Sequence, residues 1–318
     1  MIERIAELLK HETAGDPISG LKWTHKTPGK IAEQLRRLGI TVSSRTVARL
    51  LKEMGFSLRV NHKKLESGNR NPPPRDVRDQ QFEYISQMRE AFAGRGSPII
   101  SIDTKKKELI GRFKNNGTTW EREPCLVNDH DFRTDAVGRA VPYGIYDTLA
   151  NRGFVVVGTS RETPAFAVDA ITLWWRSTGS RMYPEAREVL ILADCGGGNA
   201  ARSRVWKYRL QHVLCNRHDV TVTLCHYPPG ASKWNPIEHR LFSEISKNWA
   251  GKPLENFETV LKCIRATRTT SGLRVNARLV QKEYEKGEQA TDAEMKELSL
   301  ERHEVLPDWN YTLAPSIM

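Results

Sequence analysis

Three acidic residues stand at places where secondary-structure elements are expected to begin or end. Asp103 ends the apolar run 99–103, Asp194 ends the apolar run 189–194, and Glu238 lies one turn into an expected helix. Carboxylates are hard oxygen ligands that suit Mg²⁺ or Mn²⁺, and both ions also bind phosphate oxygens. Two such ions activate the attacking oxygen and stabilise the leaving oxygen in an in-line displacement at phosphorus. Asp103, Asp194 and Glu238 are therefore the candidate catalytic residues and the candidate ligands of two metal ions.

Each of these carboxylates also has a purely structural interpretation. Asp103 could begin an Asx turn, and Asp194 could belong to a plain glycine-rich turn. The glycines that follow Asp194 do not form a phosphate-binding P-loop, because they lack its terminal G-K-[ST]. Asn235, Pro236 and Glu238 together fit a helix capping box. The order of the surrounding elements favours the metal-binding interpretation for the trio as a whole.

The elements around the three carboxylates predict an α/β domain. Strands are expected at 98–103, 108–113, 154–158, 189–194 and 220–225, and helices at 163–175, 202–215 and 236–249. Three strands followed by alternating helices and strands is the order of an RNase H-like fold, with a mixed five-stranded sheet and flanking helices. The catalytic domain would span 98–250, with an insertion at 114–152. If its first and fourth strands are neighbours, Asp103 and Asp194 meet at one edge of the sheet.

An all-α helix-turn-helix is expected before this domain, in residues 1–60. Thr27 caps a first helix, and a serine pair at 43–44 caps a second, basic one. Two short helices joined by a brief turn match a helix-turn-helix. Arg45, Thr46 and Arg49 would then contact DNA base edges or phosphates. The alternative is a small helical bundle whose charged face is only solvated.

The other segments carry weaker signals. Residues 61–97 are expected to form a proline-stiffened linker and a connecting helix. Residues 251–318 are expected to form a basic helical C-terminal extension, with a small acidic helix at 292–300. Lys105, Lys233 and Trp234 are further candidate DNA contacts. A solvated lysine run and a packing role for the tryptophan are the alternatives.

Composition points to a polyanionic partner. The 318-residue chain has a formal net charge of +11, and residues 1–70 hold 14 Lys/Arg against 7 Asp/Glu. Such an excess of base favours nucleic acid. No apolar run approaches the roughly 20 residues that span a bilayer, and no signal peptide opens the chain, so we expect a cytoplasmic protein. The five cysteines are scattered, which favours buried, reduced thiols over disulfides or zinc.

Four stretches of the sequence resemble insertion-sequence transposases of the DDE superfamily, and most closely the Rhodopirellula-type group. The stretches are 103–108 (DTKKKE), 141–147 (VPYGIYD), 193–199 (ADCGGGN) and 228–242 (PPGASKWNPIEHRLF). The resemblance covers nearly the whole chain, and the last stretch is highly specific. It implies that Asp103, Asp194 and Glu238 are the metal-binding triad.

Two departures from the family pattern stand out. Members commonly have Ala-Gly-Gly-Ser where this chain has Cys195-Gly196-Gly197-Gly198, which leaves the metal ligand intact. Members also usually carry a further helical DNA-binding segment before the point where this chain starts, so we expect an amino-terminal truncation that affects recognition of the DNA end.

The resemblance implies a transposase that hydrolyses donor strands with Mg²⁺ or Mn²⁺ and joins the 3′-hydroxyls to target DNA. Transposon ends and target DNA would be its partners, and a homodimer or larger assembly would act on paired ends near the bacterial nucleoid. Two alternatives stay open: a truncated, non-mobile DNA-binding derivative, and an RNase H-type nuclease.

Overall fold

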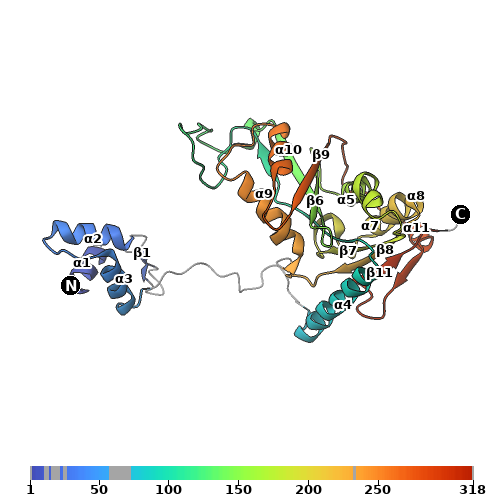
Figure 1. Ribbon diagram of the computed structural model, residues 1–318, viewed down its shortest axis with the longest axis horizontal. Coiled ribbons are helices and arrows are strands. Elements are labelled where there is room, and N and C mark those ends of the chain that lie inside the picture. The colour runs from blue at the N-terminus through green and yellow to red at the C-terminus, as the bar shows by residue number, and fades with distance from the viewer. Residues whose placement is uncertain are drawn as a thin grey trace. The chain divides into compact units, whose positions relative to one another are not determined.

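The computed structural model describes residues 2–10, 14–15, 22–23, 27–56, 73–231 and 234–316. The chain divides into two compact units, residues 1–65 and residues 66–318 (Figure 1). Each unit has hydrophobic clusters of its own. No helix in the described part of the chain is both long and apolar enough to cross a membrane.

The described residues of the smaller unit form three short helices. They are α1 (Ile2–Lys10), α2 (Pro28–Arg37) and α3 (Ser44–Glu53), with the two-residue strands β1 (Ala14–Gly15) and β2 (Lys22–Trp23) between the first two. The Thr27 and Ser43 side chains cap α2 and α3 by accepting hydrogen bonds from backbone amides three residues on. Ile5, Ile31 and Val47 are fully buried between the helices. The two predicted helices, capped by Thr27 and by the serine pair, are therefore confirmed. Most of the predicted linker lies in residues 57–72, outside the described residues.

A nine-stranded mixed sheet forms the centre of the larger unit. Its core strands are β3 (Ile99–Thr104), β5 (Gly138–Asp147), β6 (Arg152–Gly158), β7 (Glu188–Ala193) and β8 (Thr221–His226). They lie side by side in the order β8-β7-β3-β5-β6. β5 is antiparallel to β3 and β6, whereas β7 is parallel to β3 and β8. This order is that of an RNase H-like sheet, as the sequence predicts.

The second core strand is not the predicted one. The segment expected at 108–113 forms only β4 (Glu108–Ile110), which pairs with the start of β5 and not with β3. The predicted insertion at 114–152 accordingly ends at Gly138, where β5 begins. Pro142 and Gly144 lie inside β5, and both residue types ordinarily argue against a strand interior. This accounts for the error.

The C-terminal region is also not the predicted helical extension. β9 (Arg274–Val280) pairs in parallel with β6, and β10 (Leu300–Arg302) and β11 (Asn310–Leu313) extend the opposite edge beyond β8. Burial alternates along β9, so Arg274 and Arg278 are exposed while Ala277 is buried. Helix is present there only as α10 (Phe257–Ala266) and α11 (Asp292–Lys296). The region therefore completes the sheet at both edges.

Helices cover both faces of this sheet (Figure 1). One face packs against α5 (Pro164–Trp174), the π-helix η2 (Trp175–Gly179), α7 (Arg204–Arg209) and the π-helix η4 (Leu210–Cys215). The other face packs against α4 (Arg75–Gly94), the π-helix η6 (Glu238–Phe242), α9 (Ser243–Asn248) and α10. Short turns of helix occur at η1 (Arg133–Asp135), α6 (Ser180–Met182), η3 (Gly197–Asn199) and α8 (Asn216–His218).

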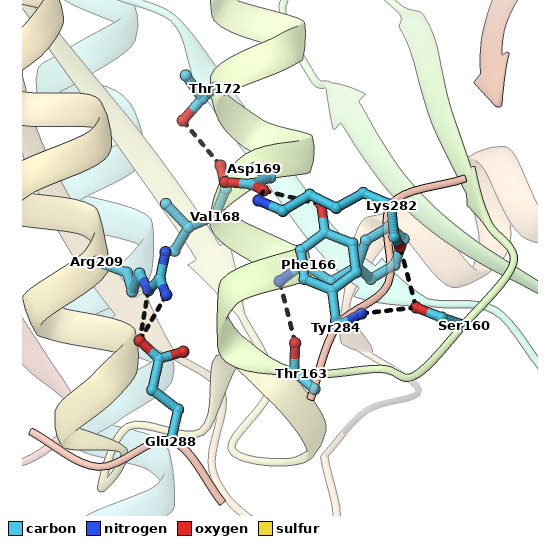
Figure 2. A network of polar contacts seen from close by, with 10 residues as sticks. All are labelled: Ser160, Thr163, Phe166, Val168, Asp169, Thr172, Arg209, Lys282, Tyr284 and Glu288. Atoms are coloured by element: carbon cyan, nitrogen blue, oxygen red, sulfur yellow. Dashed lines mark hydrogen bonds and ion pairs between the residues drawn. The ribbon is translucent and has the colours of Figure 1, made fainter. Parts of the chain in front are cut away.

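Polar contacts hold the chain against α5 after it leaves β9 (Figure 2). The Asp169 carboxylate on α5 accepts hydrogen bonds from Lys282 Nζ and from Tyr284 Oη, both at 2.8 Å. Further along, Glu288 pairs with Arg209 of α7 at 2.6 Å. The segment that joins the two edges of the sheet is thereby fixed across the helical layer.

Candidate active site

The two aspartates come together because their strands are parallel neighbours. β3 and β7 pair with Ile102 opposite Ala193, and Asp103 and Asp194 are the next residue along each strand. Their side chains therefore lie at the same end of the sheet, as predicted. Glu238, in the first turn of η6, reaches the same place and forms a side-chain hydrogen bond with Asp103.

Burial and the neighbouring negative charges disfavour the charged forms of the two aspartates. Burial raises the pKa of Asp103 to about 8, with Asp194 and Glu238 adding to the effect. The Thr104 amide opposes it by donating a hydrogen bond to Asp103 Oδ1 at 2.7 Å. Burial likewise raises the pKa of Asp194, against a hydrogen bond from the Gly196 amide. The site is therefore one where a cation would relieve a large repulsion.

The donor atoms suit a hard divalent cation. Asp194 Oδ1 is buried and has no hydrogen-bond partner, so it is an oxygen donor that nothing in the described chain satisfies. No group of three or more His, Cys, Asp or Glu side chains in the described ranges is arranged to hold a metal as it stands. The Asp103 and Glu238 side chains are instead hydrogen-bonded to each other.

The start of the Glu238 helix is held by β3 and not by a capping box. The buried Asn235 side chain donates from Nδ2 to Ile102 O at 3.2 Å, and its Oδ1 accepts from Ser101 Oγ. Ser101 Oγ also accepts from the Ile237 amide at 3.2 Å. The alternative interpretation of Glu238 as part of a capping box is therefore not supported: Ser101 of β3 accepts the hydrogen bond from the Ile237 amide, and Glu238 contacts Asp103.

Two glycines let this helix approach the sheet closely. Gly144 lies opposite Asp103 in the β3–β5 pair. A Cβ at Gly144 would lie 2.5 Å from Phe242 Cε1, and one at Gly153 would lie 2.4 Å from Leu241 Cδ1. Any larger residue would push η6 away from the strands. The segment is also a π-helix, a distortion that is frequent at functional sites.

The glycine-rich loop after Asp194 lies close to Glu162, a carboxylate that the sequence analysis did not identify. Gly197 has a φ of +62°, and a Cβ there would lie 2.7 Å from Glu162 Oε1. Glu162 pairs with Lys107 at 2.8 Å and raises the pKa of Asp194. In the sequence, its only signal is that it immediately precedes the Thr163 helix cap.

Buried polar residues hold the far side of the same loop. Tyr143 Oη donates to Asn199 Oδ1 at 3.3 Å, and His226 Nε2 lies 3.0 Å from Asn199 O. Burial raises the pKa of Tyr143, and the charges of Asp103 and Asp194 contribute to that shift. Tyr143 and His226 come from β5 and β8, so the loop is fixed from both sides of β3 and β7.

Of the DNA contacts predicted near the carboxylates, Lys105 is buried and Trp234 is exposed. Lys105 is buried, pairs with Glu108 at 3.0 Å and lies 4.5 Å from the Trp249 ring centroid, so its ammonium does not face solvent. Trp234 is 56% exposed and contacts Phe82 edge-to-face at 5.9 Å. Lys233 lies outside the described residues.

The predicted contacts in the smaller unit lie on α3. Arg45 is exposed, Arg49 pairs with Glu53 at 2.6 Å, and Thr46 Oγ1 lies 2.9 Å from the capping Ser43 hydroxyl. Arg45 and Arg49 therefore have guanidinium groups at the surface of the helix that a helix-turn-helix would present to DNA.

All five cysteines are free thiols. Cys215 and Cys225 are buried as predicted, and burial raises the pKa of each to about 12. Cys195 is partly buried, and its Sγ donates to Tyr227 O at 3.1 Å. Cys125 is exposed, which contradicts the expectation of uniformly buried thiols, because it lies in the irregular segment between β4 and β5.

Comparison with known proteins gives one family and one group of structures. Residues 4–315 match the Rhodopirellula transposase DDE domain family. No curated protein matches the chain. Among solved structures, it is similar to the Mos1 transposase paired-end complex with left transposon end, at 15% identity and a TM-score of 0.42, covering 82% of this chain and 69% of that one. The mariner Mos1 paired-end complex with Mg matches with the same identity and coverages and a TM-score of 0.45.

Proposed function

We propose that this chain, which belongs to the Rhodopirellula transposase DDE domain family, hydrolyses phosphodiester bonds at transposon ends and transfers the freed strands to target DNA. The observation that carries the proposal is the convergence of Asp103, Asp194 and Glu238 at one end of an RNase H-like sheet. Supporting it is the buried, unpartnered oxygen of Asp194.

Asp103, Asp194 and Glu238 would hold Mg²⁺ or Mn²⁺, two ions in all. When bound, these ions activate the attacking oxygen and stabilise the leaving one. The chain's own contribution is orientation. The Thr104 amide fixes one oxygen of Asp103, the Gly196 amide fixes Asp194, and the bonds from Ser101 fix the helix that carries Glu238.

Two displacements at phosphorus make up the reaction. In the first, a water oxygen bonds to phosphorus and the bond between phosphorus and the 3′ oxygen breaks. The attacking water loses a proton to solvent, and the released 3′ oxygen gains a proton. In the second, that 3′-hydroxyl oxygen bonds to a target phosphorus and loses its proton, and the bond to the target's own 3′ oxygen breaks. Both steps use the same carboxylates, so a single site suffices.

The smaller unit would recognise DNA. Arg45, Thr46 and Arg49 on α3 are the proposed contacts, because this is the basic second helix of a helix-turn-helix. Trp234 and Lys233, just before Glu238, would contact the DNA end; the buried ion pair of Lys105 makes that residue a weaker candidate. We further propose a cytoplasmic protein that acts as a homodimer or larger assembly on paired ends.

Three variants test the assignment of the triad. Asp103→Asn, Asp194→Asn and Glu238→Gln remove one charge each, and each should abolish Mg²⁺-dependent cleavage and joining while DNA binding persists. Full activity in any one of them would exclude that residue as a metal ligand. Cleavage of RNA–DNA hybrids without any joining would instead indicate a nuclease, and DNA binding without cleavage would indicate a non-mobile derivative.

A further inference from the structure

A basic cavity lies beside the catalytic end of the sheet, outside the triad. It has a volume of about 530 Å³ and is lined by residues that include Arg202, Arg204, Lys207, Arg302, Asp308 and Trp309. Its position follows from the strand register. His226 pairs with Ala193, which precedes Asp194, and Trp309 O accepts a hydrogen bond from the His226 amide at 3.0 Å. The part of the cavity around Trp309 is therefore two strands away from Asp194, at the same end of the sheet.

Carboxylates neutralise two of the four cations in the cavity. Arg302 pairs with Asp308 at 2.7 Å, and Arg204 pairs with Asp292. Within the described ranges, no carboxylate forms an ion pair with either Lys207 or Arg202. The cavity therefore carries positive charge that the described chain does not balance.

Lys207 differs from the other three basic residues of the cavity because it is buried. It is only 7% exposed, and its ammonium lies 5.0 Å from the centroid of the Tyr311 ring. Burial lowers its pKa, as does the nearby charge of Arg302, whereas the charge of Asp308 raises it. A buried charge is costly unless it is paired, and contact with an aromatic ring offsets only part of that cost. Asp308 already forms an ion pair with Arg302, so an anion in the cavity would supply Lys207 with a partner of its own.

We propose that this cavity binds a backbone phosphate of the DNA being processed, held by Lys207 and Arg202. The inference rests on the proposed function for the identity of the polyanion. DNA is favoured over a small anion because Trp309, which lines the cavity, lies at the same end of the sheet as Asp194. An interaction of this kind positions DNA without reading its sequence. It would guide the strand across β8 and β11 as it leaves the carboxylates.

The test measures binding of the full chain to a labelled DNA duplex of arbitrary sequence, in chelator, across a salt series. Lys207→Met keeps the apolar stem and removes the charge, and Arg202→Ala removes an exposed side chain. Each should weaken binding and reduce the slope of log affinity against log salt by about 0.9 for each phosphate that the variant no longer neutralises. Lys282→Met is the matched control, since Lys282 also lies over a tyrosine ring but already pairs with Asp169.

Unchanged affinity and salt slope in both cavity variants would overturn the proposal, as would an equal effect in Lys282→Met. If inorganic phosphate raises the melting temperature of the wild type but not of Lys207→Met, while DNA binding is equal in both, the cavity is a small-anion site and the proposal fails. Melting curves of each variant show whether it is folded, and the exposed Arg202 provides a result even if Lys207→Met is not. Because binding is measured without divalent ions, the outcome is separate from that of the cleavage assay.

Discussion

Asp103 and Gly144 lie directly opposite each other in the antiparallel pair of β3 and β5. One residue carries a carboxylate of the proposed site, and the other leaves the space into which Phe242 and Ile237 of the facing helical segment pack. The absence of a side chain at Gly144 therefore sets how closely Glu238 can approach Asp103.

Gly144→Ala should impair the site by moving the helix that carries Glu238. The added Cβ would lie 2.5 Å from Phe242 Cε1 and 2.9 Å from Ile237 Cδ1, so η6 must shift. Overpacking of this kind costs about 1–3 kcal/mol. We expect lower stability in urea unfolding and a loss of strand cleavage larger than that stability change explains.

Two alanine variants provide the comparison for Gly144. Gly153→Ala also meets η6, at Leu241, but from β6, one strand further from Asp103. It should destabilise the protein while retaining more activity. A Cβ at Gly94, at the end of α4, meets nothing within 4 Å, so Gly94→Ala should leave stability and cleavage unchanged. Equal activity losses at Gly144 and Gly153 would argue against a specific role for the Asp103–Gly144 pair.

Ser101→Ala should loosen the start of the same helix. Ser101 Oγ bonds to both the Asn235 side chain and the Ile237 amide, and all of these groups are buried. Leaving buried polar groups unsatisfied costs about 1–3 kcal/mol. Thermal and urea unfolding should show that loss, together with weaker cleavage. The exposed Ser86 of α4 serves as the control, and a similar loss in Ser86→Ala would contradict the capping role of Ser101.

The sequence predicts where the candidate metal ligands lie better than it predicts the contacts that support them. Asp103 and Asp194 meet at one end of the sheet as expected, because each ends an apolar strand, which is a local pattern. The Ser101–Asn235 contact joins residues 134 positions apart, so no local pattern predicts it. Residue type was then misleading, since Asn235 and Glu238 fit a capping box that tertiary contacts override.

The largest error in the predicted sheet has a similar cause. β5 lies within the segment that was predicted to be an insertion, and its Pro142 and Gly144 are residue types that weaken a strand signal. In the structure Gly144 is required by the packing of η6, and Pro142 accepts a hydrogen bond from the Lys105 amide through its carbonyl oxygen at 2.9 Å. Local propensity fails where the tertiary contacts of an element determine its sequence, as the packing at Gly144 does here.

Glu162 and Lys107 should have opposite effects on divalent cation affinity. Glu162 adds negative potential at Asp194, and Lys107, its partner at 2.8 Å, reduces that potential. Glu162→Gln should weaken Mn²⁺ binding by a few-fold, and Lys107→Met should strengthen it, as measured by calorimetry. The exposed pair of Glu258 and Lys262 on α10 is the matched control. Changes of the same sign in the two variants would show that Glu162 does not act through charge.

Stability without divalent ions should depend on pH through Asp103. Its folded-state pKa of about 8 lies above the ordinary value of 3.8, so the folded protein holds a proton that the unfolded chain has lost. This favours folding below about pH 8, and the contribution disappears as pH rises through that value. In chelator, the wild type should therefore lose more stability than Asp103→Asn between about pH 6 and pH 9.

Adding Mg²⁺ or Mn²⁺ should reverse that loss. A cation between the carboxylates compensates their charge, and binding to the folded state alone raises its stability with ion concentration. The melting temperature of the wild type at about pH 8 should therefore rise with Mn²⁺, while Asp103→Asn and Asp194→Asn should respond weakly. Asp169→Asn, which removes an acid paired with Lys282 far from the triad, should respond like the wild type. An equal Mn²⁺ response in all of these proteins would mean that the ion binds elsewhere.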